Sequence, residues 1–326
     1  MKINKKLHAL WSLMLCMNAM VVAQTDDAER TQCRLSEVAQ LPIWEFNGRF
    51  ITTLEINRRT MPFLIDTGSG GTLISPEAAD QVGVAFDRQR KVVIDGFGRF
   101  SGEGHPGIAR RIKLGSVIWQ DYAVTVTDLE GASVPRAPVG VLGADLLAQF
   151  DIEFDFPGRT MTLYRPSGCR TDWVPWLGVY QVWRPMRTAQ NALIFPVSLN
   201  EQPLFAELDT GAQMTIVSRQ AALSAGVDPK ALDETPVEAA TAVGGGAPMT
   251  VRPYLLSTFR VGALTMHHRS LYVGDAVLAN ADVLLGMDVL RNTRLWLSYS
   301  SNRIFMRYTA GPAAALQNFL SRPVRE

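Results

Sequence analysis

The segment FLIDTGSGGTLIS covers residues 63–75, and a second segment, AELDTGAQMTIVS, covers residues 206–218. A shift of 143 positions places the first segment on the second, with Asp66 on Asp209. Between residues 65 and 84, nine of twenty positions are identical under this shift without a gap. The chain therefore contains an internal repeat, which predicts two copies of one structural unit.

The repeat continues in a second pair of segments further along each copy. VGVLGADLL (139–147) aligns with DVLLGMDVL (282–290) under the same shift, so Gly143 falls on Gly286. Each of these glycines follows the Asp of its own copy by 77 residues. Matching partners at equal distances indicate that whole domains, and not a single loop, are duplicated.

Both copies carry the alternating pattern of β-strands. In residues 151–164 apolar side chains alternate with acidic ones, reach a Pro-Gly turn and then resume, and residues 295–306 repeat this pattern. Ser75 and Ser218 precede short helical stretches and suit the N-cap position. We therefore predict a mainly β fold with a few short helices. The predicted division is a signal peptide at 1–23, an N-terminal segment at 24–45, lobe 1 at 46–166, a linker at 167–192, lobe 2 at 193–308 and a C-terminal tail at 309–326.

The N-terminus has the pattern of an export signal. Basic MKINKK is followed by a largely apolar run, and Val21 and Ala23 suit a cleavage site before Gln24. The alternative is an uncleaved membrane anchor, which the short apolar run with His8 and Asn18 disfavours. We expect a periplasmic or secreted protein without stable membrane insertion after signal cleavage.

Export would leave two cysteines, Cys33 and Cys169, on either side of lobe 1. An oxidising compartment favours a disulfide between them, and two unrelated thiols are the alternative. The formal net charge is +1, from 32 basic and 31 acidic residues, which argues against a nucleic-acid partner. The sequence has no HExxH zinc motif, no GxSxG elbow and no phosphate-binding loop, so we predict no metal and no cofactor.

A DTG triplet by itself is weak evidence, because Asp, Thr and Gly are ordinary turn residues. Here each triplet follows one apolar strand and precedes another, an arrangement that holds the Asp carboxylate rigidly at the tip of a loop. The Gly allows the backbone to turn tightly there, and the Thr hydroxyl is able to bond across to the partner loop.

With these residues in place, the chain resembles the retropepsin-like aspartic proteases, the retroviral-type family that also has bacterial members. The matching residues are the two DTG loops and the later turns VLG (141–143) and LLG (284–286), each followed by a short helix. The resemblance covers both lobes and implies two homologous β-barrel lobes in a pepsin-like pseudo-twofold arrangement. Asp66 and Asp209 would face each other as the catalytic pair. The residues that would support the loops are Thr67, Gly68, Ser69, Thr210, Gly211 and Ala212.

The implied chemistry is peptide-bond hydrolysis by a water held between two carboxyl groups that share one proton. The resemblance also implies glycine-rich flaps over the substrate. DGFGRFSGEG (95–104) and AVGGGAP (242–248) lie where the flaps belong, and ordinary turns are the alternative reading. The candidate flap and substrate-binding residues are Gly96, Phe97, Gly98, Val243, Gly244 and Gly245.

We therefore predict an exported aspartic endopeptidase that acts on peptide or protein substrates as a monomer, with both lobes in one active site. One alternative is a catalytically silent protein that binds peptides on the same fold. A second alternative is the pairing of each lobe with a lobe of another chain. Glu207, where lobe 1 has Leu64, is expected to face either the solvent or a substrate subsite.

Overall fold

The computed structural model describes residues 33–95, 101–129, 136–169, 174–240, 249–275 and 280–309. The predicted signal peptide and the six candidate flap residues at 96–98 and 243–245 lie outside these ranges, and only Thr309 of the predicted tail lies inside them. Strands dominate the described residues, as predicted, and the five helices among them are short. None of these helices has the length and hydrophobicity needed to cross a membrane.

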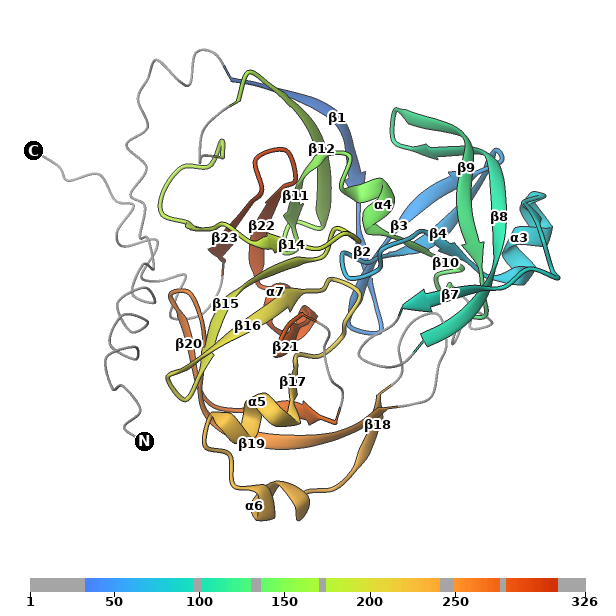
Figure 1. Ribbon diagram of the computed structural model, residues 1–326. Helices are drawn as coiled ribbons and strands as arrows, with labels where there is room; N and C mark the ends of the chain where they lie inside the picture. The colour runs from blue at the N-terminus through green and yellow to red at the C-terminus, as the bar shows by residue number, and fades with distance from the viewer. Residues whose placement is uncertain are drawn as a thin grey trace, which may run out of the picture.

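Lobe 1 is a sheet of nine strands that curves into a barrel (Figure 1). Strand β3 pairs with its neighbour β4 and also with β8, so the strand order returns on itself. The order is β2 (Trp44–Phe46), β3 (Arg49–Ile56), β4 (Arg59–Ile65), β10 (Gly140–Leu142), β5 (Leu73–Ile74), β9 (Val117–Val126), β8 (Ser101–Leu114) and β6 (Ala85–Phe86), with β7 (Val92–Asp95) paired to β8.

Lobe 2 has eight strands among its described residues. Seven of them repeat the order from β2 to β8, and β15 and β19 make the closing contact that β3 and β8 make in lobe 1, while β18 pairs with β19 as β7 pairs with β8. The two equivalent strand orders confirm the predicted pair of homologous β-barrel lobes. The order is β14 (Met186–Arg187), β15 (Leu193–Leu199), β16 (Gln202–Leu208), β21 (Val283–Leu285), β17 (Ile216–Ser218), β20 (Leu264–Gly274), β19 (Met249–Val261) and β18 (Glu238–Ala240).

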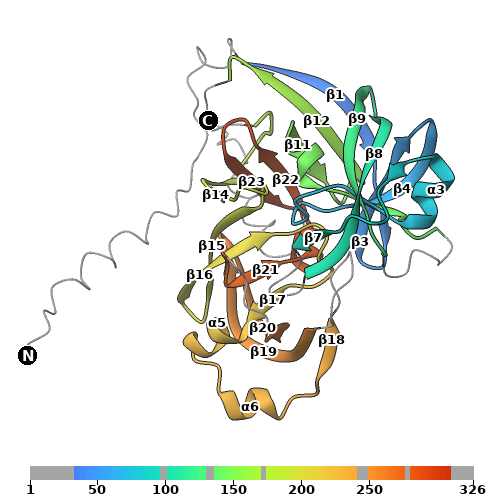
Figure 2. The same ribbon diagram turned by 45° about the vertical axis from the view of Figure 1, so that its right-hand side comes forward.

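A third sheet of six strands joins the lobes, and Figure 2 shows it bridging the two barrels. At its centre β11 and β22 run antiparallel with Phe154 opposite Leu295, so the pseudo-twofold axis passes between these strands. Both side chains are fully buried in a hydrophobic core that extends into both lobes. The order is β1 (Arg34–Pro42), β12 (Thr160–Ser167), β11 (Asp151–Asp155), β22 (Thr293–Ser298), β23 (Arg303–Tyr308) and β13 (Gln181–Trp183).

The helices sit at the ends of strands. The Ser75 hydroxyl accepts a hydrogen bond from the N–H of Ala78, and Ser218 does the same for Ala221, so both expected N-caps are present. An N-cap of this kind satisfies a backbone donor that the first turn leaves open. The helices are α3 (Pro76–Val82), α4 (Ala144–Leu147), α5 (Arg219–Ser224), α6 (Pro229–Asp233) and α7 (Met287–Leu290).

The predicted disulfide between Cys33 and Cys169 is present and joins the start of β1 to the end of β12. Strand β1 then runs antiparallel to β12, beginning with Arg34 opposite Ser167. Residues 34–42 of the N-terminal segment therefore form an edge strand of the joining sheet. Within the expected linker, β13 adds to the opposite edge of that sheet and β14 adds to lobe 2.

Candidate active site

Each DTG loop is held by the central strands of its own lobe. In lobe 1, β10 pairs parallel to β4 and antiparallel to β5, so it lies between the two strands that flank the loop. The N–H of Asp66 donates to the carbonyl of Leu142 at 3.1 Å, and the N–H of Asp209 donates to Leu285 at 3.1 Å. The two aspartates therefore occupy equivalent positions, directly after the last residue of the strand that precedes each loop.

The two aspartates meet at the interface between the lobes, where each carboxyl group lies against the glycine of the opposite DTG loop and shifts the pKa of the other. Oδ1 of Asp66 accepts from the N–H groups of Gly68 at 2.9 Å and Ser69 at 2.8 Å. Oδ1 of Asp209 accepts from Gly211 at 2.7 Å and Ala212 at 3.1 Å. Each loop thus fixes one oxygen of its carboxyl group with two backbone donors.

The threonines lock the two loops together across the interface. The N–H of Thr67 donates to the hydroxyl of Thr210 at 3.1 Å, and the N–H of Thr210 donates to the hydroxyl of Thr67 at 3.1 Å. The hydroxyls in turn donate to the carbonyls of Leu208 and Ile65, each at 2.9 Å. Both threonines are buried, so these four bonds are shielded from water.

Each DTG glycine is required by the carboxyl group of the opposite loop. A Cβ atom on Gly68 would lie 2.7 Å from Cγ of Asp209, and one on Gly211 would lie 2.2 Å from Cγ of Asp66. The sequence suggested that these glycines allow a tight turn, but neither has a left-handed φ. Glycine is needed here because any side chain would occupy the space of a catalytic carboxyl.

The later Gly turn of each lobe packs against the DTG loop of the same lobe. A Cβ on Gly143 would lie 2.4 Å from the carbonyl oxygen of Gly71, and one on Gly286 would lie 2.6 Å from that of Met214. The N–H groups of these glycines donate to the hydroxyls of Thr72 at 3.3 Å and Thr215 at 3.1 Å. The DTG loop and the later Gly turn therefore pack backbone to backbone, which explains why the two motifs keep the same sequence separation in both copies.

The position of Asp145 and Asp288 just after the Gly turns predicts helix caps, but this prediction is wrong, because the N-cap residues of α4 and α7 are the preceding glycines and make no side-chain cap. Instead, Asp145 accepts a hydrogen bond from the hydroxyl of Thr72, and Asp288 accepts one from Thr215, both at 2.7 Å. These carboxylates brace the DTG loops, and the symmetry of the repeat extends to this contact.

The environment of the pair favours protonation. Burial raises the pKa of Asp66, although the N–H of Ser69 acts in the opposite direction. Burial, and then the negative charge of Asp66 and of Glu207, raise the pKa of Asp209 well above its ordinary range. Because two adjacent carboxyl groups titrate as a unit, the pair keeps a proton at a pH where isolated aspartates would lose theirs.

The loops differ at the three positions that follow the DTG triplet, of which the first is Ser69 against Ala212. Ser69 Oγ donates to the carbonyl of Gly71 at 2.8 Å, whereas Ala212 has no hydroxyl for the equivalent bond. A larger difference lies two residues before the aspartate, where lobe 2 has Glu207 in place of Leu64. The sequence signal that singles out Glu207 is this break in the internal repeat.

Two hairpins rise from the lobes toward the predicted flap tips. Strand β7 pairs with β8 as far as Asp95 opposite Ser101, and β18 pairs with β19 as far as Ala240 opposite Met249. The residues that connect each pair are the candidate flap residues, which the structure does not describe. The described strands are thus hairpin arms at equivalent places in the two lobes.

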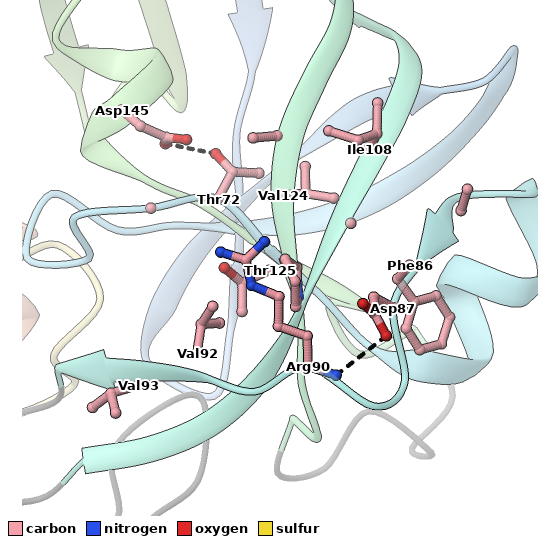
Figure 3. Close-up of a pocket in the computed structure, with 15 residues that line it drawn as sticks. Thr72, Phe86, Asp87, Arg90, Val92, Val93, Ile108, Val124, Thr125 and Asp145 are labelled. Atoms are coloured by element: carbon pink, nitrogen blue, oxygen red, sulfur yellow. Dashed lines mark hydrogen bonds between the residues drawn. The ribbon is translucent and has the colours of Figure 1, made fainter.

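Lobe 1 also has a pocket of about 650 Å³ beside β7, shown in Figure 3. Thr72 and Asp145 lie on one side of it, and Arg90, Val92 and Val93 lie on another (Figure 3). Neither catalytic candidate is among its lining residues, so it is separate from the aspartate pair. In the described part of the chain, no three His, Cys, Asp or Glu side chains are grouped as metal ligands would be.

Comparison with known proteins finds an aspartyl protease domain in each half of the chain. The family model for aspartyl protease matches residues 52–146, and the model for the gag-polyprotein aspartyl protease matches residues 195–292. A search of curated proteins found no match. Among solved structures, an aspartic proteinase from Irpex lacteus is 14% identical with a TM-score of 0.49, over 85% of this chain and 98% of that one.

Proposed function

We propose, from the premise that this chain is a retropepsin-like aspartic protease with one aspartyl protease domain in each half, that Asp66 and Asp209 together hydrolyse internal peptide bonds. The observation that carries this proposal is the close apposition of the two carboxyl groups, each presented by the loop of one lobe beside the glycine of the other loop. Two acids in contact supply a base and an acid to the same reacting bond.

The reaction starts with one proton shared by the pair. The ionised carboxylate removes a proton from a water, the water oxygen bonds to the peptide carbonyl carbon, and the protonated carboxyl gives its proton to the carbonyl oxygen. The resulting tetrahedral diol breaks down when a proton passes to the peptide nitrogen and the C–N bond breaks. One water is consumed, a carboxylic acid and an amine are formed, and the pair returns to its starting state.

The surroundings of the pair serve this chemistry. The four backbone N–H groups on the Oδ1 atoms fix both carboxyls before substrate arrives, so little reorganisation accompanies the reaction. We place the substrate between the pair and the hairpins β7–β8 and β18–β19, and we propose that these hairpins close over it. Closure would exclude bulk water and leave the attacking water in place.

We further propose that the protein is exported and works as a monomer. The basic and apolar N-terminal sequence and the disulfide between Cys33 and Cys169 support export. The joining sheet and the threonine lock, both formed within one chain, support a monomer. N-terminal sequencing of the exported protein tests the first proposal, and gel filtration of the active species tests the second.

Cleavage of a diverse peptide mixture by the purified protein, read by mass spectrometry between pH 3 and 8, tests the catalytic proposal. The Asp66→Asn and Asp209→Asn variants should each lose cleavage by at least about 10²–10⁴-fold, the usual contribution of a positioned acid or base. Circular dichroism of both variants controls for folding. Cleavage that survives both substitutions would refute the assignment, and retention of peptides without cleavage by the wild type would favour a binding protein.

A further inference from the structure

We propose that Glu207 makes this protease prefer substrates with a lysine or arginine side chain beside the scissile bond. The inference rests on the proposed function, because it assigns a substrate preference to the cleft that contains Asp66 and Asp209. It begins from the one position near the catalytic pair where the internal repeat exchanges an apolar residue for a charged one.

Glu207 lies on the same face of β16 as the catalytic aspartate of its lobe. Side chains alternate along a strand, and Ala206 and Leu208 are buried in the main core. Glu207 therefore points away from that core, in the same direction as Asp209 two residues later. The exposed Phe205, two residues earlier, is on this face as well.

In lobe 1 the equivalent face is apolar. Leu64 is buried in a small cluster with Ile51, Leu73 and Val141, separate from the main core. Ile94, on the hairpin strand β7, packs against this cluster. The cluster therefore extends from the strand that carries Asp66 to the hairpin that rises beside it, where a bound peptide would pass.

Lobe 2 builds the same cluster around Ile216, Leu284, Met249 and Val251. Ala240, the last described residue of its hairpin strand β18, packs against it. The repeat places Glu207 where this cluster would have the counterpart of Leu64. The result is a carboxyl group set in an apolar wall.

The carboxyl group of Glu207 has no hydrogen-bond or ion-pair partner within the described residues. Burial raises its pKa to about 7, with a further contribution from the negative charge of Asp66. Glu207 is partly exposed, so a ligand is able to reach it. A carboxylate that is largely withdrawn from water and has no partner is costly, and the usual compensation is a cation at hydrogen-bonding distance. A substrate side chain is able to provide that cation when the peptide binds.

Lysine and arginine suit this surface for two reasons. Their aliphatic stems pack favourably on the partly exposed apolar residues that cover the cluster, such as Ala212 and Tyr272, and their charged heads reach the carboxylate. A cation also offsets the repulsion between Glu207 and the catalytic pair. On the other side of the scissile bond, the cluster around Leu64 favours an apolar side chain.

The test is a peptide library that varies the two residues flanking the cleaved bond. The wild type should prefer Lys or Arg over norleucine at one flanking position by at least tenfold, and this ratio should rise between pH 5 and pH 8 as Glu207 ionises. Glu207→Gln and Glu207→Leu should lower the ratio to about one or below. Glu201→Gln, an exposed change in the same lobe, should leave it unchanged.

A uniform change of rate for all peptides in the Glu207 variants, with the same preference as the wild type, would overturn the proposal. The preference is also measurable without turnover, as the affinity ratio of a lysine peptide and a norleucine peptide for the Asp66→Asn variant by calorimetry. Equal affinities there would overturn the role of Glu207. A protein that shows the affinity ratio but cleaves nothing would keep the Glu207 role and refute the proposed catalysis instead.

Discussion

Thr67 and Thr210, which lie 143 residues apart, exchange backbone-to-hydroxyl hydrogen bonds of 3.1 Å in both directions. Each hydroxyl also donates to the carbonyl of the residue immediately before the Asp of the other loop. The hydroxyl of Thr67 donates to Leu208, and that of Thr210 donates to Ile65. The two DTG loops therefore behave as one unit, and the separation of the carboxyl groups is set by this lock.

Replacement of Thr210 by valine should destabilise the protein and impair catalysis. The N–H of Thr67 and the carbonyl of Ile65 would remain buried without their partner, at a cost of about 2–5 kcal/mol in total. Small displacements of reacting groups cost about 10²-fold in rate. Urea unfolding and peptide cleavage measure both effects, and Thr210→Ser, which keeps the hydroxyl, should lie close to the wild type.

Gly211→Ala should abolish activity with a smaller effect on folding. The added Cβ would lie 2.2 Å from Cγ of Asp66, so the carboxyl group must move away from its partner. Gly71→Ala is a matched control in the first loop, because no atom lies within 4 Å of a Cβ at that position. We expect cleavage to be lost in the first variant and kept in the second, and equal loss in both would contradict this explanation.

The stability of the protein should fall as the pH rises from about 4.5 to about 7, in part because of Glu207. Its pKa is 4.5 in its ordinary state and about 7 in the folded protein, so the folded state binds the extra proton in this window. Ionisation above the window then costs up to about 3 kcal/mol. Glu207→Gln should flatten this part of the profile of unfolding free energy, measured in urea at pH 5 and pH 8. An unchanged difference between the two pH values would contradict the assignment.

The alkaline limit of activity should also depend on Glu207. Its negative charge raises the pKa of Asp209, which delays loss of the proton that the pair must keep for catalysis. In Glu207→Gln the alkaline limb of the pH profile of kcat should therefore move to lower pH. A shift to higher pH, measured with a peptide that has no cationic side chain, would contradict this electrostatic effect.

The disulfide should stabilise lobe 1 without taking part in catalysis. It joins residues 136 positions apart, at the end of the β1–β12 pairing. A variant with Cys33 and Cys169 both changed to serine should lose about 2–5 kcal/mol of unfolding free energy but retain cleavage when folded. Wild-type protein unfolded in the presence of a reductant should match this variant, and a reduced wild type as stable as the oxidised one would contradict the prediction.

Several features could be predicted because they leave a local pattern in the sequence. The aspartate loops, the Gly turns and the N-caps at Ser75 and Ser218 are short motifs whose chemistry is contained in a few neighbouring residues. The disulfide prediction used the expected export to an oxidising compartment and the positions of Cys33 and Cys169 on either side of lobe 1. The flap tips stay a prediction, since they lie outside the described residues.

Other features depend on contacts between distant residues and could not be predicted in this way. Asp145 has the sequence context of a helix cap, yet its carboxylate accepts a hydrogen bond from the hydroxyl of Thr72, 73 residues earlier. Strands β13 and β14 lie in a stretch with little alternation, and their pairing with β23 and β15 is what makes them strands. Their place is set by the edges that the two lobes leave free.

The sequence by itself determined that the chain is a duplicated β protein with one DTG aspartate in each copy, because two pairs of matching motifs at equal distances preserve the order of the central strands and loops. Only the tertiary structure decided why the glycines at 68 and 211 are needed and what surrounds Glu207. The physical reason is that both depend on how closely the two lobes approach. A carboxyl group from one lobe fills the space beside a glycine of the other, and the resulting burial sets the charge of the site.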